Sequence, residues 1–599
     1  MQSNPTTYFS ILQGMIDNYK IFSYVDDLDE SYGEPISRVL GLYRTPREII
    51  RTIEFYSDNQ FLSGNLDELG REKPFYNIGN YRVTVAKTAT DLDVKDIRFE
   101  PDSLKFSVQS MIMNRALYEY LKASNFSLFL NEMSYVRPKY GGVLAKKSKV
   151  DGKLKIDVVD WTNVRFNPKN VQNGVIIEKF YLQPSELAAK TGTWEVDDFL
   201  DEHMKRNKNK PVDAEIWEVS GDFPDKMYPD NENSMDYEDS GEYKRMCFYL
   251  GVVGKKKFML YYEYEKENPY KYLAWEKRGD GFGRGVIEDG FQAQVWTNDA
   301  MISMKNAMDI SGKVILATDS QKVSGNAIIG TDNGHIFQLE AGRSITSLNL
   351  APSALPQFQT TIDLWNQQYN NIASTYDANT GEAPTAGTPY SQTALLNQVA
   401  NSPFEFRREE AGIWLNEILN DWIYPELKRE AMKTEWLVSE FDQEELDIID
   451  ESIANFEANN AIHKQNLEGE ELASPEFQAT VTNDVKNQLK KFGKKREITM
   501  PKGYLDVKGK LTANITGELK NKAAMLQSLD SVFKTVVSTY NPQTGQYGAL
   551  QDPVLAKIFG QIVEMSGIPF SAGQFRPSQT QPMAQADVSA VAPATPIPA

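Results

Sequence analysis

A stripe of apolar residues over 355–376 restricts the fold more than any other feature of the sequence. Seven positions alternate steps of three and four residues: Leu355, Phe358, Ile362, Trp365, Tyr369, Ile372 and Tyr376. This spacing places all seven side chains on one narrow face of an α-helix. A narrow apolar face is satisfied by one neighbouring element, so we expect a helix over 355–376 that packs against another helix.

A second long helix is predicted upstream of this one. A cluster of four glycines ends at Gly285, and residues 286–313 then carry apolar groups at helical spacing. At 1.5 Å per residue this helix would span about 42 Å. Between the two helices, residues 314–354 are rich in β-branched residues and contain the turn sequence Asn333-Gly334. We therefore expect a small β module inserted between two helices.

The sequence after the striped helix predicts a loop followed by a bent helix. Residues 377–390, DANTGEAPTAGTPY, hold two Gly, two Pro and no basic residue. A 14-residue loop is long for a passive connection, and loops of that length are often functional. Helical spacing resumes over 391–438, where Pro403 and Pro425 are expected to bend or break the helix.

The remaining segments mix helices and strands, so the whole chain is expected to be α+β. Residues 1 to about 135 have mostly helical spacing, and a β-hairpin then turns at Asp151-Gly152. Its lysines are interpreted as a solvated strand edge rather than a nucleic-acid patch. The segment 439–516 is charged and helical, with a strand pair over 503–516. Helices are expected over 517–570, and a disordered tail over 571–599.

Composition excludes several classes of protein. The 599 residues carry 64 Lys and Arg against 83 Asp and Glu, a formal charge of −19, which disfavours a clamp that neutralises the phosphates of duplex DNA. The one cysteine, Cys247, allows no disulfide within the chain and is expected to be a small buried side chain. No signal peptide and no apolar run of about 18 residues is present, so we expect a soluble protein without a membrane segment.

Signatures of catalysis are missing from the sequence. The three histidines, His203, His335 and His463, belong to no metal-binding spacing, and no Gly-Lys pair lies in a phosphate-binding loop. The sequence GFGRGV lacks the third glycine of a dinucleotide fingerprint, and no GxSxG nucleophile elbow is present. We therefore expect an architectural protein with no catalytic residue, cofactor or metal, rather than an enzyme.

The order of long helix, small β insert, striped helix, loop and bent helix resembles the portal proteins of tailed double-stranded DNA bacteriophages. The segment GFGRGVIEDGFQAQVWTNDAMISMKNAMDI resembles their Gly-led first stem helix, and LPQFQTTIDLWNQQYNNIASTY their second. VDWTNVRFNP resembles the wing of podovirus-type portals, with crAss-like phages as one candidate origin. The resemblance implies an α/β wing (1–285), first stem helix (286–313), clip (314–354), second stem helix (355–376), tunnel loop (377–390), long bent helix (391–438), wing return (439–516), helical crown (517–570) and tail (571–599).

This resemblance also implies a function and a set of partners. Twelve copies would form a ring at one capsid vertex of the virion, assembled in the host cytoplasm, for genome packaging, retention and ejection. The ring would contact the major capsid protein, dock terminase and then head-tail adaptor or tail proteins, and let double-stranded DNA pass without sequence recognition.

Site residues follow from the same comparison. The seven striped residues above would pack the stem. The tunnel loop would use Asp377, Asn379, Thr380, Gly381, Glu382, Thr385, Gly387 and Tyr390, and the clip would use Ile328, Asp332, Asn333, Gly334 and Ile336.

Two alternatives remain open from the sequence. One is a metal-dependent enzyme that processes nucleic acid, which would need carboxylates converging in a cleft. The other is a different ring or shell protein of the virion, which copy number per particle would distinguish.

Overall fold

The computed structural model shows an α+β protein, as predicted, made of two compact units. The first unit combines residues 1–98, 116–430 and 511–514, and the second combines 99–115, 431–510 and 515–599. The structure describes residues 35–39, 42–68, 70–103, 106–150, 152–208, 210–224, 243–279, 281–311, 315–318, 345–348, 355–375, 390–431, 436–437, 443–467, 475–491, 497–498, 504–513, 540–541 and 546–547.

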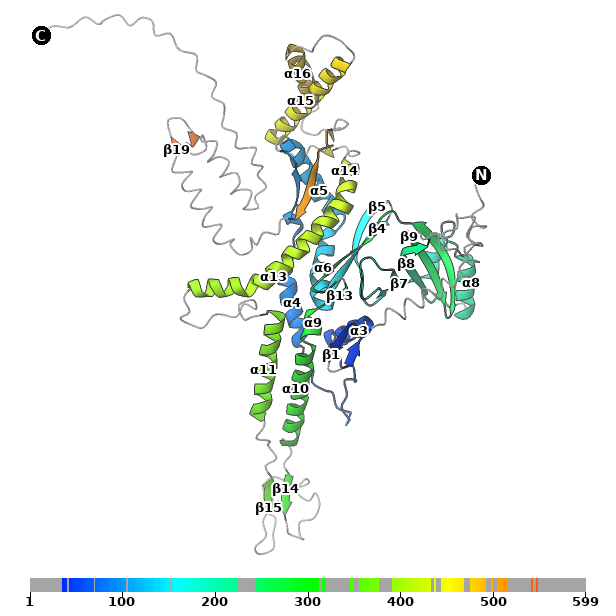
Figure 1. Cartoon of the computed structure of the whole chain (residues 1–599), viewed down its shortest axis with the longest axis vertical. Helices are drawn as coiled ribbons and strands as arrows, with labels where there is room; N and C mark the ends of the chain where they lie inside the picture. The colour runs from blue at the N-terminus through cyan, green and yellow to red at the C-terminus, as the bar shows by residue number, and fades with distance from the viewer. Residues whose placement is uncertain are drawn as a thin grey trace, which may run out of the picture. The chain divides into compact units, whose positions relative to one another are not determined.

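Among the described residues of the first unit, the largest sheet is antiparallel and has five strands (Figure 1). Its order is β10-β9-β8-β7-β6, with β6 at one edge. Side chains along a strand alternate between the two faces of the sheet. Phe199 of α8 packs on the face where Ile216 and Leu260 are buried, with its ring beside Gly251. The elements are β6 (Val164–Arg165), β7 (Ile176–Leu182), α7 (Pro184–Ala189), α8 (Asp197–Arg206), β8 (Ala214–Pro224), β9 (Tyr243–Val253) and β10 (Lys256–Tyr264).

A second sheet has the order β11-β4-β5 and contains the predicted hairpin. Strands β4 (Gly142–Val150) and β5 (Lys153–Val158) pair with Val150 opposite Lys153, and β11 (Tyr270–Ala274) pairs with β4. Gly152 has a φ of +76°, the left-handed conformation that this tight turn requires. The hairpin thus turns between Val150 and Lys153, at the predicted place.

One hairpin lysine contradicts the interpretation of a solvated edge. Lys149, Lys153 and Lys155 are exposed, as expected. Lys146 instead points at the five-stranded sheet, where its Nζ lies 2.8 Å from Glu178 Oε2 and 2.7 Å from Glu218 Oε2. Removing one partner of a largely buried ion pair leaves the other charge uncompensated, so Lys146 is an internal link between the two sheets.

From residue 35 on, where the described residues begin, four helices agree with the mostly helical character predicted for the chain up to about 135. They are α3 (Pro46–Ser57), α4 (Ile78–Thr90), α5 (Ser107–Ala123) and α6 (Phe126–Tyr140), accompanied by the short strands β1 (Ser37–Val39), β2 (Leu42–Arg44) and β3 (Ile97–Pro101). Helix α3 begins with a capping box, in which Thr45 and Glu48 satisfy each other's backbone N–H groups.

The glycine cluster marks a place where two backbone segments touch. Helix α6 ends at Gly141, which has a φ of +98°, and the hairpin β12 (Glu276–Arg278) and β13 (Gly281–Arg284) crosses it. A Cβ on Gly283 would lie 2.1 Å from Gly141 O, and one on Gly285 would lie 2.6 Å from Gly141 N. No side chain fits at Gly283 or Gly285, so these two glycines allow the close approach of the two backbone segments.

The bent helix predicted over 391–438 is present, with different limits. Helix α13 (Tyr390–Ile418) contains Pro403, a π-helical turn η4 (Leu419–Ile423) follows, and α14 (Tyr424–Ala431) has Pro425 in its first turn. The ribbon of α13 changes direction along its length (Figure 1). The helix does not reach 438, because Trp436–Leu437 form β16, which pairs with β17 (Glu497–Ile498).

Two asparagines of this bent helix bind the edge of a strand from the C-terminal part of the chain. Asn420 donates to Leu511 O and accepts from Leu511 N–H, both at 2.8 Å, and Asn416 accepts from Ala513 N–H at 2.7 Å. That strand, β18 (Gly509–Ala513), pairs with β3. A strand pair within 503–516 was therefore a wrong expectation, because the partner strand comes from the N-terminal part of the sequence.

The described core of the second unit is a helical hairpin. Helices α15 (Gln443–Leu467) and α16 (Pro475–Lys491) pack together, and Tyr504 donates a 2.7 Å hydrogen bond to Ser452 of α15. Within 517–570 the structure describes strands β19 (Tyr540–Asn541) and β20 (Gln546–Tyr547), which pair antiparallel, and the helices predicted for this range stay a prediction. The rest of 514–570 and the tail 571–599 lie outside the described residues.

Candidate assembly site: the root of the α10–α11 helix pair

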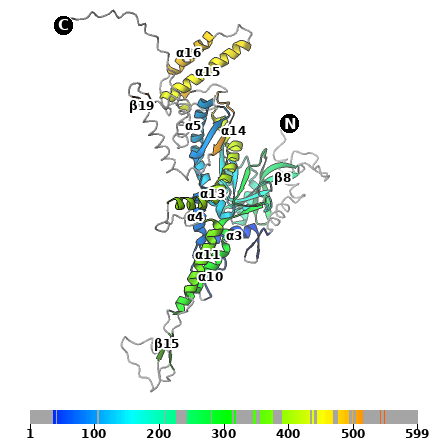
Figure 2. The same ribbon diagram turned by 60° about the vertical axis from the view of Figure 1, so that its left-hand side comes forward.

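Two long helices of the first unit lie side by side in both views (Figures 1 and 2). They are α10 (Phe291–Ser311) and α11 (Leu355–Ala373). Strands β14 (Ile315–Thr318) and β15 (Ile345–Leu348) follow α10 and precede α11, and they pair antiparallel with Ile315 opposite Leu348. The predicted order of helix, β insert and helix is thus observed among the described residues.

The helix predicted over 286–313 is interrupted near its start. The structure has α9 (Val286–Asp289), a break at Gly290, and then α10. The ring of Tyr369 from α11 fills the space beside Gly290, where a Cβ would come within 1.7 Å of the ring. Tyr369 is fully buried, and its hydroxyl donates a 2.9 Å hydrogen bond to Val286 O. Burial raises the pKa of this phenol, so the hydroxyl stays protonated and the bond persists.

Arg82 of α4 attaches that helix to α11. Its guanidinium carbon lies 4.3 Å from the centroid of the Tyr369 ring, a cation–π contact. Its Nη2 donates to Asn366 O at 3.0 Å and to Asn370 Oδ1 at 2.7 Å. Burial lowers the pKa of Arg82, and these contacts offset the cost of burying its charge.

Gln294 of α10 caps the start of α4. The first N–H groups of a helix have no partner within the helix. Gln294 Oε1 accepts from the N–H groups of Ile78 at 2.9 Å and Gly79 at 3.1 Å, and its Nε2 donates to Tyr76 O at 2.6 Å. One buried amide therefore satisfies three backbone groups. We call Arg82, Gly290, Gln294 and Tyr369 the root of the helix pair.

The segment before α4 runs along α10 beyond the root. Arg71 donates to Asp309 at 3.1 Å and to Asn306 at 2.9 Å, and Lys305 donates to Glu72 O at 2.7 Å. These contacts are partly exposed and individually weak. Together they hold α10 in line with the segment that leads into α4.

The stripe of 355–376 correctly predicts most of the packing of α11. Ile362 and Tyr369 are buried, and Leu355, Phe358 and Trp365 are half-buried. Trp365 stacks on Trp296 of α10, with 6.5 Å between ring centroids. Ile372 is the exception: it is 52% exposed, because the helix turns Ala373 inward instead. Tyr376 lies outside the described residues, and α11 ends at Ala373 before Ser374, whose φ is +56°.

Several large apolar side chains of the helix pair remain partly exposed to solvent. Four of them are about half exposed: Trp296, Met308, Leu364 and Ile372. The stripe of 355–376 includes Ile372 but not Leu364, because its periodicity identifies one face of the helix only.

The other predicted site residues fall where the structure gives no description. For the tunnel loop these are Asp377, Asn379, Thr380, Gly381, Glu382, Thr385 and Gly387, while Tyr390 begins α13. For the clip they are Ile328, Asp332, Asn333, Gly334 and Ile336. The roles assigned to them remain predictions.

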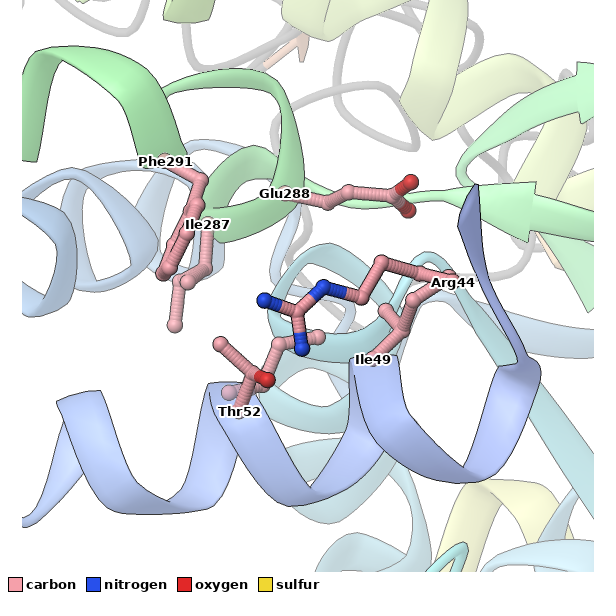
Figure 3. A pocket seen from close by; sticks show the side chains of 7 residues that line it. Arg44, Ile49, Thr52, Ile287, Glu288 and Phe291 are labelled. Carbon is pink, nitrogen blue, oxygen red and sulfur yellow. The ribbon is translucent and has the colours of Figure 1, made fainter. Parts of the chain in front are cut away.

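A small cavity lies between α3 and the start of α10 (Figure 3). The Arg44 guanidinium extends between Ile287 and Thr52 there, and Glu288 pairs with Arg278 at 2.5 Å. The cavity volume of about 20 Å³ holds one water molecule. It is too small to bind an organic ligand.

Neither a metal site nor a membrane-spanning helix is found in the described parts of the chain. There, no three His, Cys, Asp or Glu side chains converge in a way that could hold a metal ion. None of the described helices is long and apolar enough to span a bilayer. Cys247 is buried, as expected, with its Sγ 3.8 Å from Glu218 Oε1, and burial raises the pKa of its thiol.

The described residues thus define an α+β protein with an anchored helix pair. No protein-family model matches the sequence, and no curated protein matches it. Among solved structures, this chain is similar to a chain of "Neck of native GTA particle computed with C12 symmetry", with a TM-score of 0.32 and 10% sequence identity, over 65% of this chain and 82% of that chain. A likeness at this level does not identify the family.

Proposed function

We propose that this protein is a phage portal protein, which forms a ring of twelve copies at one capsid vertex for genome packaging, retention and ejection. The observation that carries the proposal is the helix pair α10–α11, fixed at one end by the root and joined at the other through the paired strands β14 and β15. The bent helix α13 follows in the chain order that the resemblance requires.

The partly exposed apolar side chains of the helix pair support assembly into a ring. Trp296, Leu364 and Ile372 are each about half exposed in the single chain, where apolar surface in contact with water is unfavourable. In a cyclic ring, one face of each copy meets a different face of its neighbour. We propose that neighbouring copies cover these side chains.

The negative net charge of the chain supports a channel through which DNA passes without binding to the wall. Twelve copies at −19 each would carry a formal charge of about −228. Duplex DNA carries about one negative charge per 1.7 Å, so an acidic wall repels it and keeps friction low. The proposed role is structural and uses no catalytic residue, metal or cofactor.

The segments at the two ends of α11 are assigned to partners and to the channel. We propose that residues 314–354 dock terminase and then head-tail adaptor or tail proteins, and that the major capsid protein surrounds the ring. Residues 377–390 join α11 to α13, and we propose that this loop narrows the channel. The assembled ring would reside in the virion.

The first experiment is the mass of the purified chain by light scattering, with images of the particles. Twelve copies of 67.8 kDa give about 814 kDa, and a ring of that mass with a central hole is expected. The double variant Leu364→Glu and Ile372→Glu should reduce ring formation at least tenfold, whereas Gln367→Glu with Gln368→Glu, exposed on the same helix, should leave it intact. A strict monomer in the presence of capsid and scaffold proteins would contradict the proposal.

A deletion tests the loop separately. Removing residues 380–388 should permit ring formation and impair retention of packaged DNA, because the channel is left wider. Normal packaging and retention by that variant would overturn the assignment of the loop. DNA cleavage by the purified protein that needs a metal and stops with a chelator would favour the nuclease alternative instead.

A further inference from the structure

A cavity of about 410 Å³ lies between helix α3 and residues 161–166, which include strand β6. Two faces of α3 border different cavities. Ile49 and Thr52 face the one-water cavity of Figure 3, whereas Arg47, Ile50 and Arg51 line the larger one. Its volume falls within the range of about 300–1,000 Å³ that is usual for ligand-binding pockets. We call it the arginine cavity, because three arginines line it.

The arginines of this cavity are Arg47, Arg51 and Arg165. Arg47 and Arg51 are exposed and lie four residues apart, so their side chains share one face of α3, where like charges repel. In the part of the chain that the structure describes, neither of these two forms an ion pair with a carboxylate. The guanidinium carbon of Arg51 lies 5.4 Å from the centroid of the Phe55 ring, a contact that keeps it along the helix. Arg47 and Arg51 are therefore accessible to an anion from outside.

Glu54, the carboxylate among the described lining residues, is engaged from inside the protein. Its Oε1 lies 2.7 Å from Lys139 Nζ and also accepts a hydrogen bond from the Tyr140 hydroxyl. It therefore does not neutralise the arginines. The described lining side chains comprise three arginines and this one glutamate, a net charge of +2, although the whole chain carries −19. A concave surface that concentrates one sign of charge attracts groups of the opposite sign.

The shape of the cavity disfavours nucleic acid and small inorganic ions as ligands. The rings of Trp161 and Phe166 are 1% and 3% exposed, with 4.9 Å between their centroids in an edge-to-face contact. Neither ring offers the exposed aromatic face on which a base would stack. Duplex DNA is bound through rows of phosphate contacts rather than through one cavity. A single inorganic anion would leave most of the space empty, since the volume is about twenty times that of the one-water cavity.

A carboxylate on a short aliphatic stem matches both the charge and the apolar lining. A guanidinium group binds a carboxylate through two parallel hydrogen bonds. We propose that the arginine cavity binds an acidic peptide segment of a partner protein, with its carboxylates paired to Arg47 and Arg51 and its aliphatic stems against Ile50. Helix α3 begins at Pro46 beside the cavity, so the positive end of its dipole adds to the attraction. This docking site does not depend on the ring proposed above.

Fluorescence anisotropy of labelled hexaglutamate, titrated with the full-length protein, tests this proposal. Hexaglutamine with the same label is the uncharged control peptide and should bind at least tenfold more weakly. Arg47→Gln combined with Arg51→Gln should also weaken hexaglutamate binding at least tenfold. Lys149→Gln combined with Lys153→Gln removes the same amount of charge from the exposed hairpin end and should leave the affinity unchanged. Circular dichroism of each variant confirms that it is folded.

Chemical modification of arginine locates the binding site. Phenylglyoxal is added with and without hexaglutamate, and the modified arginines are identified by mass spectrometry. The peptide should protect Arg47 and Arg51 and leave Arg429, exposed on α14, reactive. Equal binding by the two double variants, equal binding of the two peptides, or no binding at millimolar peptide would overturn the proposal. Protection by inorganic phosphate or duplex DNA but not by the peptide, or by contact between copies of the chain alone, would also overturn it.

Discussion

The ring of Tyr369 occupies the space that any side chain at residue 290 would need. A Cβ on Gly290 would lie 1.7 Å from Tyr369 Cε2. The hydroxyl of the same tyrosine donates a hydrogen bond to the carbonyl oxygen of Val286, one helical turn before Gly290. The break between α9 and α10 is therefore the place where α11 is attached. Contact between these two residues fixes where the helix pair leaves the rest of the first unit.

Gly290→Ala should destabilise the protein by at least about 2 kcal/mol, because the ring must move out of a packed site. Thermal unfolding followed by circular dichroism measures the effect. In a Tyr369→Ala background the same substitution should cost much less, since the obstructing ring is gone. Equal costs in the two backgrounds would show that the contact does not govern this site.

Gln294→Leu should reduce stability by about 2–4 kcal/mol. The leucine leaves the N–H groups of Ile78 and Gly79 buried without an acceptor, and an unsatisfied buried group costs about 1–3 kcal/mol. Gln292→Leu is the matched control, because Gln292 is exposed on the same helix. Denaturant unfolding of the two variants should differ clearly, and similar midpoints would argue against the capping role.

Lys146→Met should destabilise the protein by about 3–5 kcal/mol at pH 7, the cost of leaving a buried ion pair without one partner. Burial already raises the pKa of Glu218, so this carboxyl takes up a proton readily when the lysine is absent. The loss should therefore shrink as the pH falls towards 5. Adding Glu178→Gln and Glu218→Gln should restore much of the stability, whereas Lys153→Met, on the exposed hairpin end, should have little effect in the same melting experiments.

Asp289→Asn should stabilise the protein above pH 6. Burial raises the pKa of Asp289 to about 6 despite the ion pair with Arg284 at 3.2 Å. Because the folded-state pKa lies above the unfolded one, the acid's contribution to stability is full below about pH 4 and is lost as the pH rises through 6. Two pKa units correspond to about 3 kcal/mol as an upper bound.

Melting temperatures of this variant and the parent protein should coincide near pH 4 and diverge by pH 8. Asp201→Asn, exposed on α8, serves as the control and should change the melting temperature little at either pH. A constant difference between Asp289→Asn and the parent across this range would contradict the assignment.

The spacing of apolar residues predicts which helices form and which of their faces are buried. It does not identify the polar side chains that are buried as well. The stripe of 355–376 is sufficient to identify Ile362 and Tyr369 as packing residues, and both are buried. Gln294 and Arg82 are buried too, but in the sequence they look like ordinary polar positions of exposed helix faces. Their partners are backbone groups far away in the chain, which no local pattern encodes.

The same reason explains the wrong expectations for strands and lysines. Strand β18 pairs with β3, about 400 residues earlier, so its partner could not be found within 503–516. In the sequence, Lys146 looks like the other hairpin lysines. It is distinguished only by its ion pairs with Glu178 and Glu218, two carboxylates on another sheet. The break at Gly290 was also invisible, since a helix tolerates an isolated glycine.

The spacing of Asn416 and Asn420 along the bent helix nearly equals the spacing of the two strand residues that they bind. Asn416 and Asn420 are four helical residues apart, about 6 Å along the axis, and Leu511 and Ala513 are two strand residues apart, about 6.6 Å. This near-equality lets a helix take the place of a neighbouring strand along one edge of β18. Inserting or deleting one residue between 416 and 420 would rotate one amide about 100° away, so this stretch of the protein tolerates changes of residue type far better than changes of length.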